Sequence, residues 1–328
     1  MNSQQAAAAA AAGVSNATIF KPLGFYIRGF SSLQQNDYYF IFMLVLYICT
    51  LLANILIMSI IWFTESLHTP KYIAVFSLAV VDISYSTALI PKSVDIFIFN
   101  SRFVFYDPCL TQMFFVHYFS AMESFALSVL AYDRLIAICF PLRSNTLNTN
   151  RRMILIVTIS WTVPFIVVLS MVSLISRLSF CRSTTVNSYF CDHGPLFKNA
   201  CNDYSVNWFM AAFYIVVLFF IPLFFILMSY VCIIVSLLKI ASKNGRMKAF
   251  KTCTAHLTLV AIFYTPLLVT YIIAWVNVTI DTDARIYNTS LSSCIPPLVN
   301  PIVYTLKTEE ILEQVKRCIT KRKIGFTR

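Results

Sequence analysis

The sequence predicts an all-α fold: a seven-transmembrane helix bundle followed by a short amphipathic helix. The first observation is composition, because 59% of the residues are hydrophobic and only 12% are charged, with a mean hydropathy of +0.74. Soluble globular domains carry about 25% charged residues. The second observation is a series of apolar stretches, each reaching the roughly 20 residues that cross a hydrocarbon core as a helix. A water-soluble fold is therefore disfavoured.

The apolar stretches follow one another along the chain with short connections. They are expected at 38–63, 72–99, 111–140, 153–175, 206–238, 249–276 and 286–306. Single polar residues interrupt most of them, which suits helices that face one another as well as lipid. The chain then divides into a tail (1–37), the bundle (38–306) and a terminal segment (307–328).

The orientation follows from the basic residues. Most of the 25 Lys and Arg residues fall in loops and a tail on one side of the bundle, and cytoplasmic loops are the ones that retain positive charge. The N-terminal tail is then extracellular, which agrees with the glycosylation acceptor at Asn16. No removable signal peptide is expected, because no basic region precedes an apolar run with a cleavage site.

The terminal segment predicts a helix that lies against the membrane. Glu309, Glu310 and Glu313 come first and the basic residues of 316–323 come last, an order that the helix dipole favours. The basic end is expected to contact anionic membrane lipid. The net charge of +11 does not indicate nucleic-acid binding, because the basic residues are scattered over loops beside apolar spans.

Four cysteines fall in exterior segments, where disulfides form. They are Cys109, Cys181, Cys191 and Cys201, and they allow three pairings among which spacing does not choose. Two bridges that staple the long loop between spans four and five are expected. A metal site is the poorer alternative, because the spacing lacks a Cys-x-x-Cys and His193 is the only histidine nearby.

Six short motifs occur in a fixed order. They are LHTPKY at 67–72, LAVVD at 78–82, LAYDR at 130–134, SY at 229–230, KAFKTCTAH at 248–256 and PLVNPIVY at 297–304. This ordered set resembles the vertebrate odorant receptors, a branch of the rhodopsin-like G-protein-coupled receptors. The Lys-Ala-x-x-Thr-Cys-x-x-His segment is the part that points to odorant receptors within the wider superfamily.

The motifs also depart from the family pattern. Leu130 and Leu135 stand where the family usually has Met and Tyr, Ala53 stands where Gly is usual, and Lys71 stands where Met is common. These differences point to a divergent branch, such as one from a fish. The ionic and amide residues of the motifs are retained.

The resemblance implies a function and a location. It implies an odorant receptor that binds a small molecule from outside and activates a heterotrimeric G protein of the stimulatory olfactory type, which raises cyclic AMP. The plasma membrane of olfactory cilia is the expected location, and no constellation of residues indicates an enzyme. The alternative is a rhodopsin-like receptor for a hormone or lipid outside the nose. The resemblance also implies the disulfides Cys109–Cys191 and Cys181–Cys201.

Two carboxylates are expected at similar depth inside the bundle. Val116, Ser120, Glu123, Leu127, Leu130 and Arg134 recur at spacings of three and four, so they form one stripe that faces the other helices. Asp82 in span two should repel Glu123 unless a cation or proton lies between them. We expect a sodium or proton site at Asp82 and Glu123, with Asn54 and Asn300 as polar neighbours. A water-filled hydrogen-bond network with a protonated Glu123 is the alternative.

The inner ends of the helices carry the residues expected to switch. Arg134 is expected to pair with Asp133 at rest and to move toward Tyr230 and the G protein on activation. Asn300, Pro301 and Tyr304 resemble the seventh-helix switch of the family, and Pro222 and Pro266 allow bends in spans five and six. The alternatives are an Arg134 that only reaches toward the interface and a static kink in the seventh helix.

The outer halves of spans three, five, six and seven are expected to line the ligand pocket. The candidates are His117, Ser120, Ala121, Tyr214, Tyr264, Leu267 and Tyr271. His256, Val260, Tyr264, Leu267 and Tyr271 share one stripe, and Tyr264 stands where the family senses its ligand. Core packing is the alternative for each aromatic residue. Val116 replaces the Asp of amine receptors, which disfavours a monoamine, although Lys92, Asp95 or Asp192 near the mouth can anchor a polar ligand.

Overall fold

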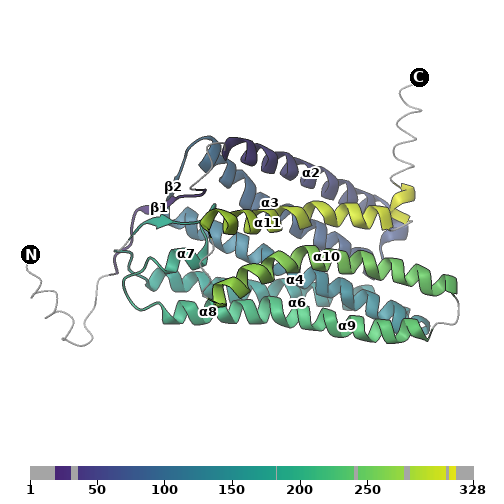
Figure 1. The fold of residues 1–328 in the computed structure, drawn as a ribbon. Helices are drawn as coiled ribbons and strands as arrows, with labels where there is room; N and C mark the ends of the chain where they lie inside the picture. The colour runs from purple at the N-terminus through teal and green to yellow at the C-terminus, as the bar shows by residue number, and fades with distance from the viewer. Residues whose placement is uncertain are drawn as a thin grey trace, which may run out of the picture.

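The computed structural model describes residues 19–30, 36–181, 183–239, 243–276, 281–307 and 310–314. Long helices run side by side along one axis (Figure 1). They are α2 (Asn36–Phe63), α3 (Pro70–Ile98), α4 (Tyr106–Cys139), α6 (Asn150–Ser173), a rod made of α8 (Ser205–Ile215), η4 (Val216–Phe220) and α9 (Ile221–Leu238), then α10 (Lys243–Val276) and α11 (Thr282–Lys307). The predicted bundle of seven helices is confirmed, and each expected span falls within or close to one of them.

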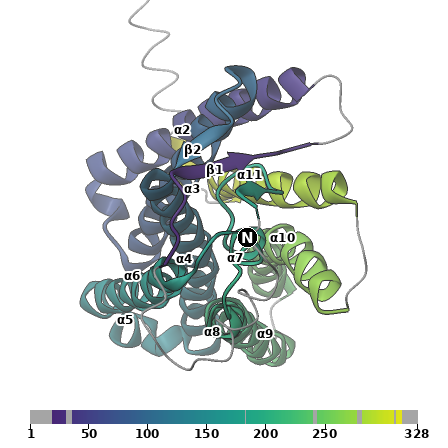
Figure 2. The same ribbon diagram turned by 90° about the vertical axis from the view of Figure 1, so that its left-hand side faces the viewer.

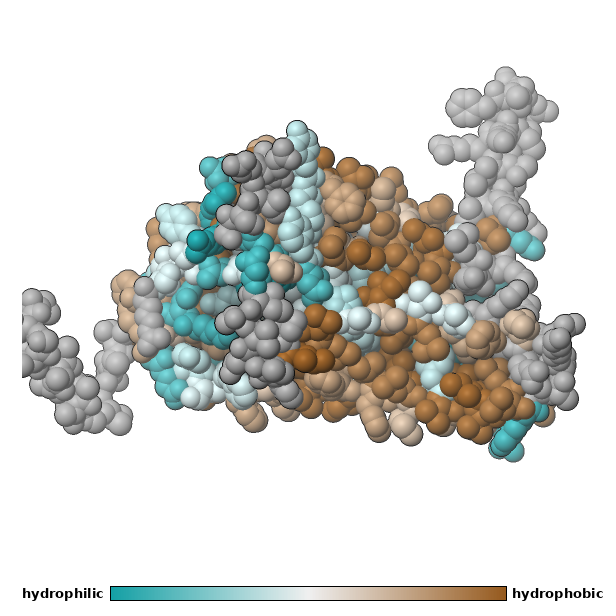
Figure 3. Space-filling model, viewed as in Figure 1, coloured by the Kyte–Doolittle hydropathy of each residue, from teal (hydrophilic) through white to brown (hydrophobic). Residues whose placement is uncertain are grey.

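Within the described residues, six of these helices are long and apolar enough to cross a membrane. The seventh, α11, carries polar residues that face the bundle, since Ser290 and Asn300 are buried. A hydrophobic surface covers most of the length of the bundle, while hydrophilic residues gather at the end that carries β1 and α7 (Figure 3). We call this the outer end, and the opposite one the inner end.

The helix α4 is the central element of the bundle. It contacts α3, α6, α9 and α10, and Figure 2 shows the arrangement from the outer end. The stripe predicted for this helix is confirmed, because Val116, Glu123, Leu127 and Leu130 are buried. The side chains of Ser120 and Arg134 at the same face are partly buried.

A small sheet closes the outer end, which the sequence did not predict. Its strands are β1 (Gly24–Ile27), β2 (Phe103–Phe105) and β3 (Thr185–Val186), in the order β2-β1-β3. The pair β1–β2 is antiparallel and the pair β1–β3 is parallel. A Cβ on Gly24 would lie 2.3 Å from the Val104 carbonyl oxygen, so only glycine permits this approach. Such short strands carry little sequence signal, because each is stabilised by partners far away in the chain.

Two disulfides hold the loop between α6 and α8. Cys109 in the first turns of α4 is bonded to Cys191, and Cys181 is bonded to Cys201. This is the pairing that the resemblance implies. The loop also contains η3 (Leu174–Arg177), β3 and α7 (His193–Phe197). The first bridge therefore anchors the loop over the outer end of the bundle.

The inner end has short connecting helices. They are η1 (Glu65–Leu67) between α2 and α3, and η2 (Pro141–Arg143) with α5 (Ser144–Leu147) between α4 and α6. Residues 310–314 are helical, and Lys71 Nζ lies 3.9 Å from Glu310 Oε2. The sequon at Asn16, Glu309 and the basic residues of 316–323 lie outside the described residues.

Candidate functional site

The outer end brings together two predicted ligand residues, His117 and Tyr214, and one residue of the loop, Asp192. His117 on α4 donates from Nδ1 to the Met113 carbonyl (2.9 Å), and its Nε2 lies 3.7 Å from Asp192 Oδ1 in the loop. Tyr214 on α8 donates its hydroxyl to the His117 carbonyl at 3.1 Å. The His117–Asp192 contact becomes a full ion pair when the imidazole carries a second proton. These groups form a polar wall that joins α4, α8 and the loop.

His193, next to Asp192, is a buried group that sequence reasoning passed over as a binding residue. Its ring lies 6.3 Å from that of His117, and its Nε2 has no hydrogen-bond partner among the described residues. Burial, together with repulsion from His117, lowers the pKa of His193 to about 3 from 6.5. The imidazole is therefore neutral under physiological conditions.

Ser124 connects three helices at mid-depth. Its hydroxyl donates to the Leu218 carbonyl at 2.8 Å and shares a 2.7 Å hydrogen bond with the Tyr264 hydroxyl. The Leu218 carbonyl needs this donor, because its ordinary helical partner four residues on is Pro222, which has no N–H. Ser124 is fully buried. Tyr264, the predicted sensor on α10, is thus tied through one serine to α4 and to the π-helical turn η4.

The remaining predicted ligand residues line the same interior. Ala121 is fully buried, and Ser120, Leu267 and Tyr271 are partly buried. The ring of Tyr271 lies 6.2 Å from that of Phe219 on η4. The stripe predicted on α10 therefore faces inward, so each of these side chains contacts the bundle and not only lipid.

The two predicted carboxylates are both buried in the centre. Asn300 on α11 donates from Nδ2 to Asp82 Oδ1 at 2.9 Å. Among the described residues, Asp82 Oδ2, both oxygens of Glu123 and Ser86 Oγ have no hydrogen-bond partner. Buried oxygens without partners are costly unless a cation, a proton or water satisfies them. This arrangement fits a hard cation such as sodium, which prefers oxygen ligands.

Asn54 has a different role from the one expected for it. Its Nδ2 donates to the carbonyls of Thr50 and Pro297, both at 3.0 Å, and not to Asp82. The Pro297 carbonyl would be the acceptor for the residue four positions on, which is Pro301 and lacks an N–H. Asn54 therefore satisfies the carbonyl that Pro301 leaves free, and so ties α2 to the proline-containing turn of α11.

At the inner end, the predicted pair between Asp133 and Arg134 is not formed. Both residues are described, and no ion pair joins them. Asp133 instead accepts a hydrogen bond of 2.9 Å from Nδ2 of Asn148, which lies just after α5. The reason is the helical geometry: adjacent residues on a helix point about 100° apart, so a partner from another element reaches Asp133 more easily.

Tyr230 on α9 contacts His256 on α10. Its hydroxyl lies 2.8 Å from His256 Nδ1, and His256 Nε2 lies 3.1 Å from the Leu127 carbonyl. Because a carbonyl only accepts, Nε2 carries the ring proton and Nδ1 accepts from the tyrosine hydroxyl. Tyr304 on α11 is buried at the same end. The bond between Tyr230 and His256 closes α9 and α10 against α4.

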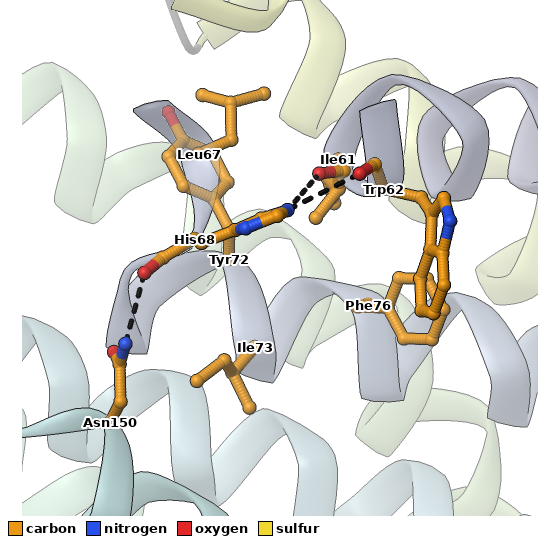
Figure 4. Close-up of a pocket in the computed structure, with 8 residues that line it drawn as sticks. All are labelled: Ile61, Trp62, Leu67, His68, Tyr72, Ile73, Phe76 and Asn150. Carbon is orange, nitrogen blue, oxygen red and sulfur yellow. Dashed lines mark hydrogen bonds between the residues drawn. The ribbon is translucent and has the colours of Figure 1, made fainter. Parts of the chain in front are cut away.

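Two cavities lie away from the seven candidate pocket residues. One lies at the outer ends of α3 and α4. The other, of about 280 Å³, lies at the inner end and is lined largely by apolar side chains, among them Trp62, Tyr72 and Phe76. Figure 4 shows His68 at its edge, with Nε2 against the Ile61 and Trp62 carbonyls and its own carbonyl accepting from Asn150. His68 thereby links the end of α2 to the start of α6.

Sequence reasoning missed Ser124, Asn148 and His68 as connecting residues. Ser124 is one residue from Glu123 and offers no special spacing, and Asn148 lies in a loop without a motif. His68 belongs to a recognised motif, but its partners, the last carbonyls of α2 and Asn150, become neighbours only in the fold. A sequence signal exists for Ser124: its acceptor, the Leu218 carbonyl, lies four residues before Pro222. The acceptor of Asn54, the Pro297 carbonyl, lies four residues before Pro301 in the same way.

Known proteins resemble this chain over most of its length. A family model described as olfactory receptor matches residues 42–322. Olfactory receptor 51F2 from Homo sapiens is 33% identical over 94% of this chain and 91% of its own length. Olfactory receptor 1M1 from Mus musculus is 33% identical over 91% of this chain and 95% of its own. The crystal structure of squid rhodopsin has a TM-score of 0.71 at 15% identity, covering 92% of this chain and 91% of that one.

Proposed function

Because the chain belongs to the olfactory receptor family, we propose that it binds an odorant from the extracellular side and activates a stimulatory olfactory G protein, raising cyclic AMP. The family makes it a G-protein-coupled receptor with a small-molecule ligand, and not an enzyme. The observation that supports the proposal best is Ser124, which hydrogen-bonds both Tyr264 and the Leu218 carbonyl. A ligand that displaces Tyr264 changes this contact and with it the packing of α10 on α4.

The odorant is proposed to lie between the outer wall and Ser124. His117 and Tyr214 supply polar groups on one side, and Ala121, Leu267 and Tyr271 supply apolar surface below. Asp192 and the buried, neutral His193 close the site from the loop. This mixture suits a small molecule that is mainly apolar with one hydrogen-bonding group.

A sodium ion or a shared proton is proposed at Asp82 and Glu123. The support is the set of buried oxygens without partners at these residues and at Ser86. Sodium that binds there stabilises the fold by mass action. The thermal midpoint of the purified receptor should therefore rise with sodium but not with the same concentration of choline, and Glu123→Gln should remove that difference. An equal response to both salts would leave the proton as the only candidate.

Signalling is proposed to pass from Tyr264 to the inner end. Movement of α10 breaks the bond between His256 and Tyr230, which frees Tyr230 to approach Arg134, while α11 bends at Asn300 and Pro301 and carries Tyr304 with it. The N-terminal tail is proposed to be extracellular and the receptor to reside in olfactory cilia. Epitope tags at the two ends test the orientation, because an odd number of spans puts them on opposite faces.

The test of function is ligand-dependent cyclic AMP in transfected cells. The panel contains amino acids, steroids, bile acids and small volatile organic compounds. With an active ligand, Tyr264→Phe and Ser124→Ala should each raise the half-maximal concentration or lower the maximal response, because each breaks one side of the same hydrogen bond. Tyr38→Phe is the matched control, since Tyr38 is 71% exposed. Responses unchanged in both variants at equal surface expression would contradict the role of Ser124.

A further inference from the structure

A second cavity opens at the outer end between α3 and α4, apart from the residues proposed for the odorant. Its volume is about 490 Å³, within the range of small-molecule sites. Ala88 and Lys92 line it from α3, and Asp107, Thr111 and Phe115 line it from α4. Lys92, which was expected near the mouth as an anchor for a polar ligand, lines this cavity, whereas the seven candidate pocket residues on spans three, five and six do not.

Polarity in this cavity changes with depth. Asp107, Thr111 and Phe115 are spaced four residues apart, so they lie on one side of α4, and Phe115 lies about 12 Å deeper than Asp107. On α3, which runs in the opposite direction, Lys92 lies about 6 Å nearer the outer end than Ala88. The charged groups therefore form the rim and the apolar groups the floor, where Phe115 is 43% exposed. An amphiphile with its head outward matches this gradient.

The charged residues at the rim determine which head group an amphiphile in the cavity can have. Lys92 Nζ lies 2.5 Å from Asp95 Oδ2, and an ammonium has three donors, so two remain for a ligand. Asp107 is exposed and takes part in no ion pair among the described residues. Lys92 and Asp107 line the rim, and with Asp95 beside Lys92 the charges at this end of the cavity sum to −1. An anionic head is repelled, whereas a zwitterionic head places its anion at Lys92 and its ammonium at Asp107.

The inner wall of the cavity is held in place. Gln112, also on α4, is buried and accepts a hydrogen bond of 3.3 Å from the Cys191 N–H through Oε1. Cys191 is in turn bonded to Cys109, three residues before Gln112. The cavity is thus backed by a cross-linked part of the molecule, so its shape is largely preformed.

We propose that this cavity binds a zwitterionic phospholipid of the outer leaflet. The phosphate lies at Lys92, the choline ammonium at Asp107, and the start of an acyl chain runs along Ala88 and Phe115. The membrane is the source of the ligand because the cavity descends into the apolar part of the bundle surface. This site is independent of the proposed odorant and its signalling.

The experiment measures lipid retention by the full chain. The receptor, purified in detergent, is mixed with equal amounts of phosphatidylcholine and phosphatidylglycerol, and bound lipid is counted by native mass spectrometry. Phosphatidylcholine should be retained preferentially. Lys92→Gln should weaken its binding about tenfold, because a charge-assisted hydrogen bond is lost. Asp107→Asn should weaken it about threefold and abolish the preference over phosphatidylglycerol.

Two further variants keep the test decisive. Asp281→Asn removes an exposed carboxylate outside the cavity and should bind both lipids as the unmodified chain does. Ala88→Phe fills the floor without changing any charge and should lower retention of both lipids. Retention without preference, unchanged phosphatidylcholine binding in Lys92→Gln, or a preference that persists in Asp107→Asn would overturn the proposal. Competition by glycerophosphocholine as strong as that by the whole lipid would overturn the membrane source.

Discussion

The two ends of the bundle are held together by different kinds of contact. At the outer end, two disulfides and a three-stranded sheet tie the loop after α6 to α4 and to the N-terminal segment. At the inner end, the helices are joined by hydrogen bonds such as those from Tyr230 to His256 and from Asn148 to Asp133. A covalent bridge does not exchange during signalling, whereas one hydrogen bond contributes about 1 kcal/mol. Rearrangement is therefore easier at the inner end than at the outer end.

Between the two ends, side chains replace missing backbone donors at prolines. Ser124 bonds the carbonyl freed by Pro222, and Asn54 bonds the carbonyl freed by Pro301. A carbonyl that accepts from a side chain of another helix can lose or regain this hydrogen bond when the helices move. At each of these prolines, a hydrogen bond between two helices thus replaces a backbone hydrogen bond within one helix.

The largest effect should come from removing a disulfide at the outer end. Cys109→Ser removes the bridge that closes a sequence separation of 82 residues, and loss of a native disulfide typically costs about 2–5 kcal/mol. We expect surface expression to fall to a small fraction of the unmodified level, measured by flow cytometry of an N-terminal tag. Cys232→Ser, at an exposed free thiol, is the control. Normal expression of Cys109→Ser would mean that the outer end does not depend on its bridge.

The next effect is a pH dependence of the outer end. The pKa of His193 is about 3 in the folded chain and 6.5 when exposed. The unfolded chain therefore gains a proton that the folded chain excludes, so stability is full above pH 6.5 and falls as the pH drops toward 3. At pH 5 the loss is about 2 kcal/mol. The thermal midpoint of the purified receptor should be lower at pH 5 than at pH 7. The decrease should be smaller in the His193→Gln variant. Equal falls would show that other groups dominate.

A smaller effect is expected at the inner end, where His256 is the test. His256→Phe keeps the ring beside Tyr230 but removes the hydrogen bonds to Tyr230 and to the Leu127 carbonyl. If these bonds restrain α10, the equilibrium shifts by about 1 kcal/mol, which is about fivefold. Basal cyclic AMP, normalised to surface expression, should rise by that factor. A basal level equal to or below that of the unmodified receptor would contradict the restraint.

The smallest effect should follow from the contact of Asp133. Asn148→Ala removes one partly buried hydrogen bond, so basal cyclic AMP should rise about twofold to threefold. Asp133→Asn separates two explanations. If Asp133 acts only through its contact with Asn148, Asn148→Ala and Asp133→Asn should raise basal cyclic AMP equally. A larger rise in Asp133→Asn would show that the charge also acts on Arg134 in a conformation other than this one.

Much of the fold was predictable because its signals are local. Length and apolarity predicted all seven helices, including the rod over 206–238, but not the π-helical turn η4 within it. The site was predicted in part: Tyr264, Asp82 and Glu123 lie where motif position and periodicity indicate. The contacts were not predicted, because Ser124 meets Tyr264, and Asn148 meets Asp133, only across elements that are distant in sequence.

By itself, the sequence determined that this chain forms a bundle of apolar helices, which faces of α4 and α10 turn inward, and to which receptor family it belongs. These properties depend on hydrophobic periodicity and on motifs read along one segment. Three features emerge only once the helices pack together. Asp133 bonds Asn148 and not Arg134, Asn54 bonds the Pro297 carbonyl and not Asp82, and three short strands cover the outer end. A hydrogen bond depends on distances of a few tenths of an ångström between different elements, and no pattern within one element fixes them.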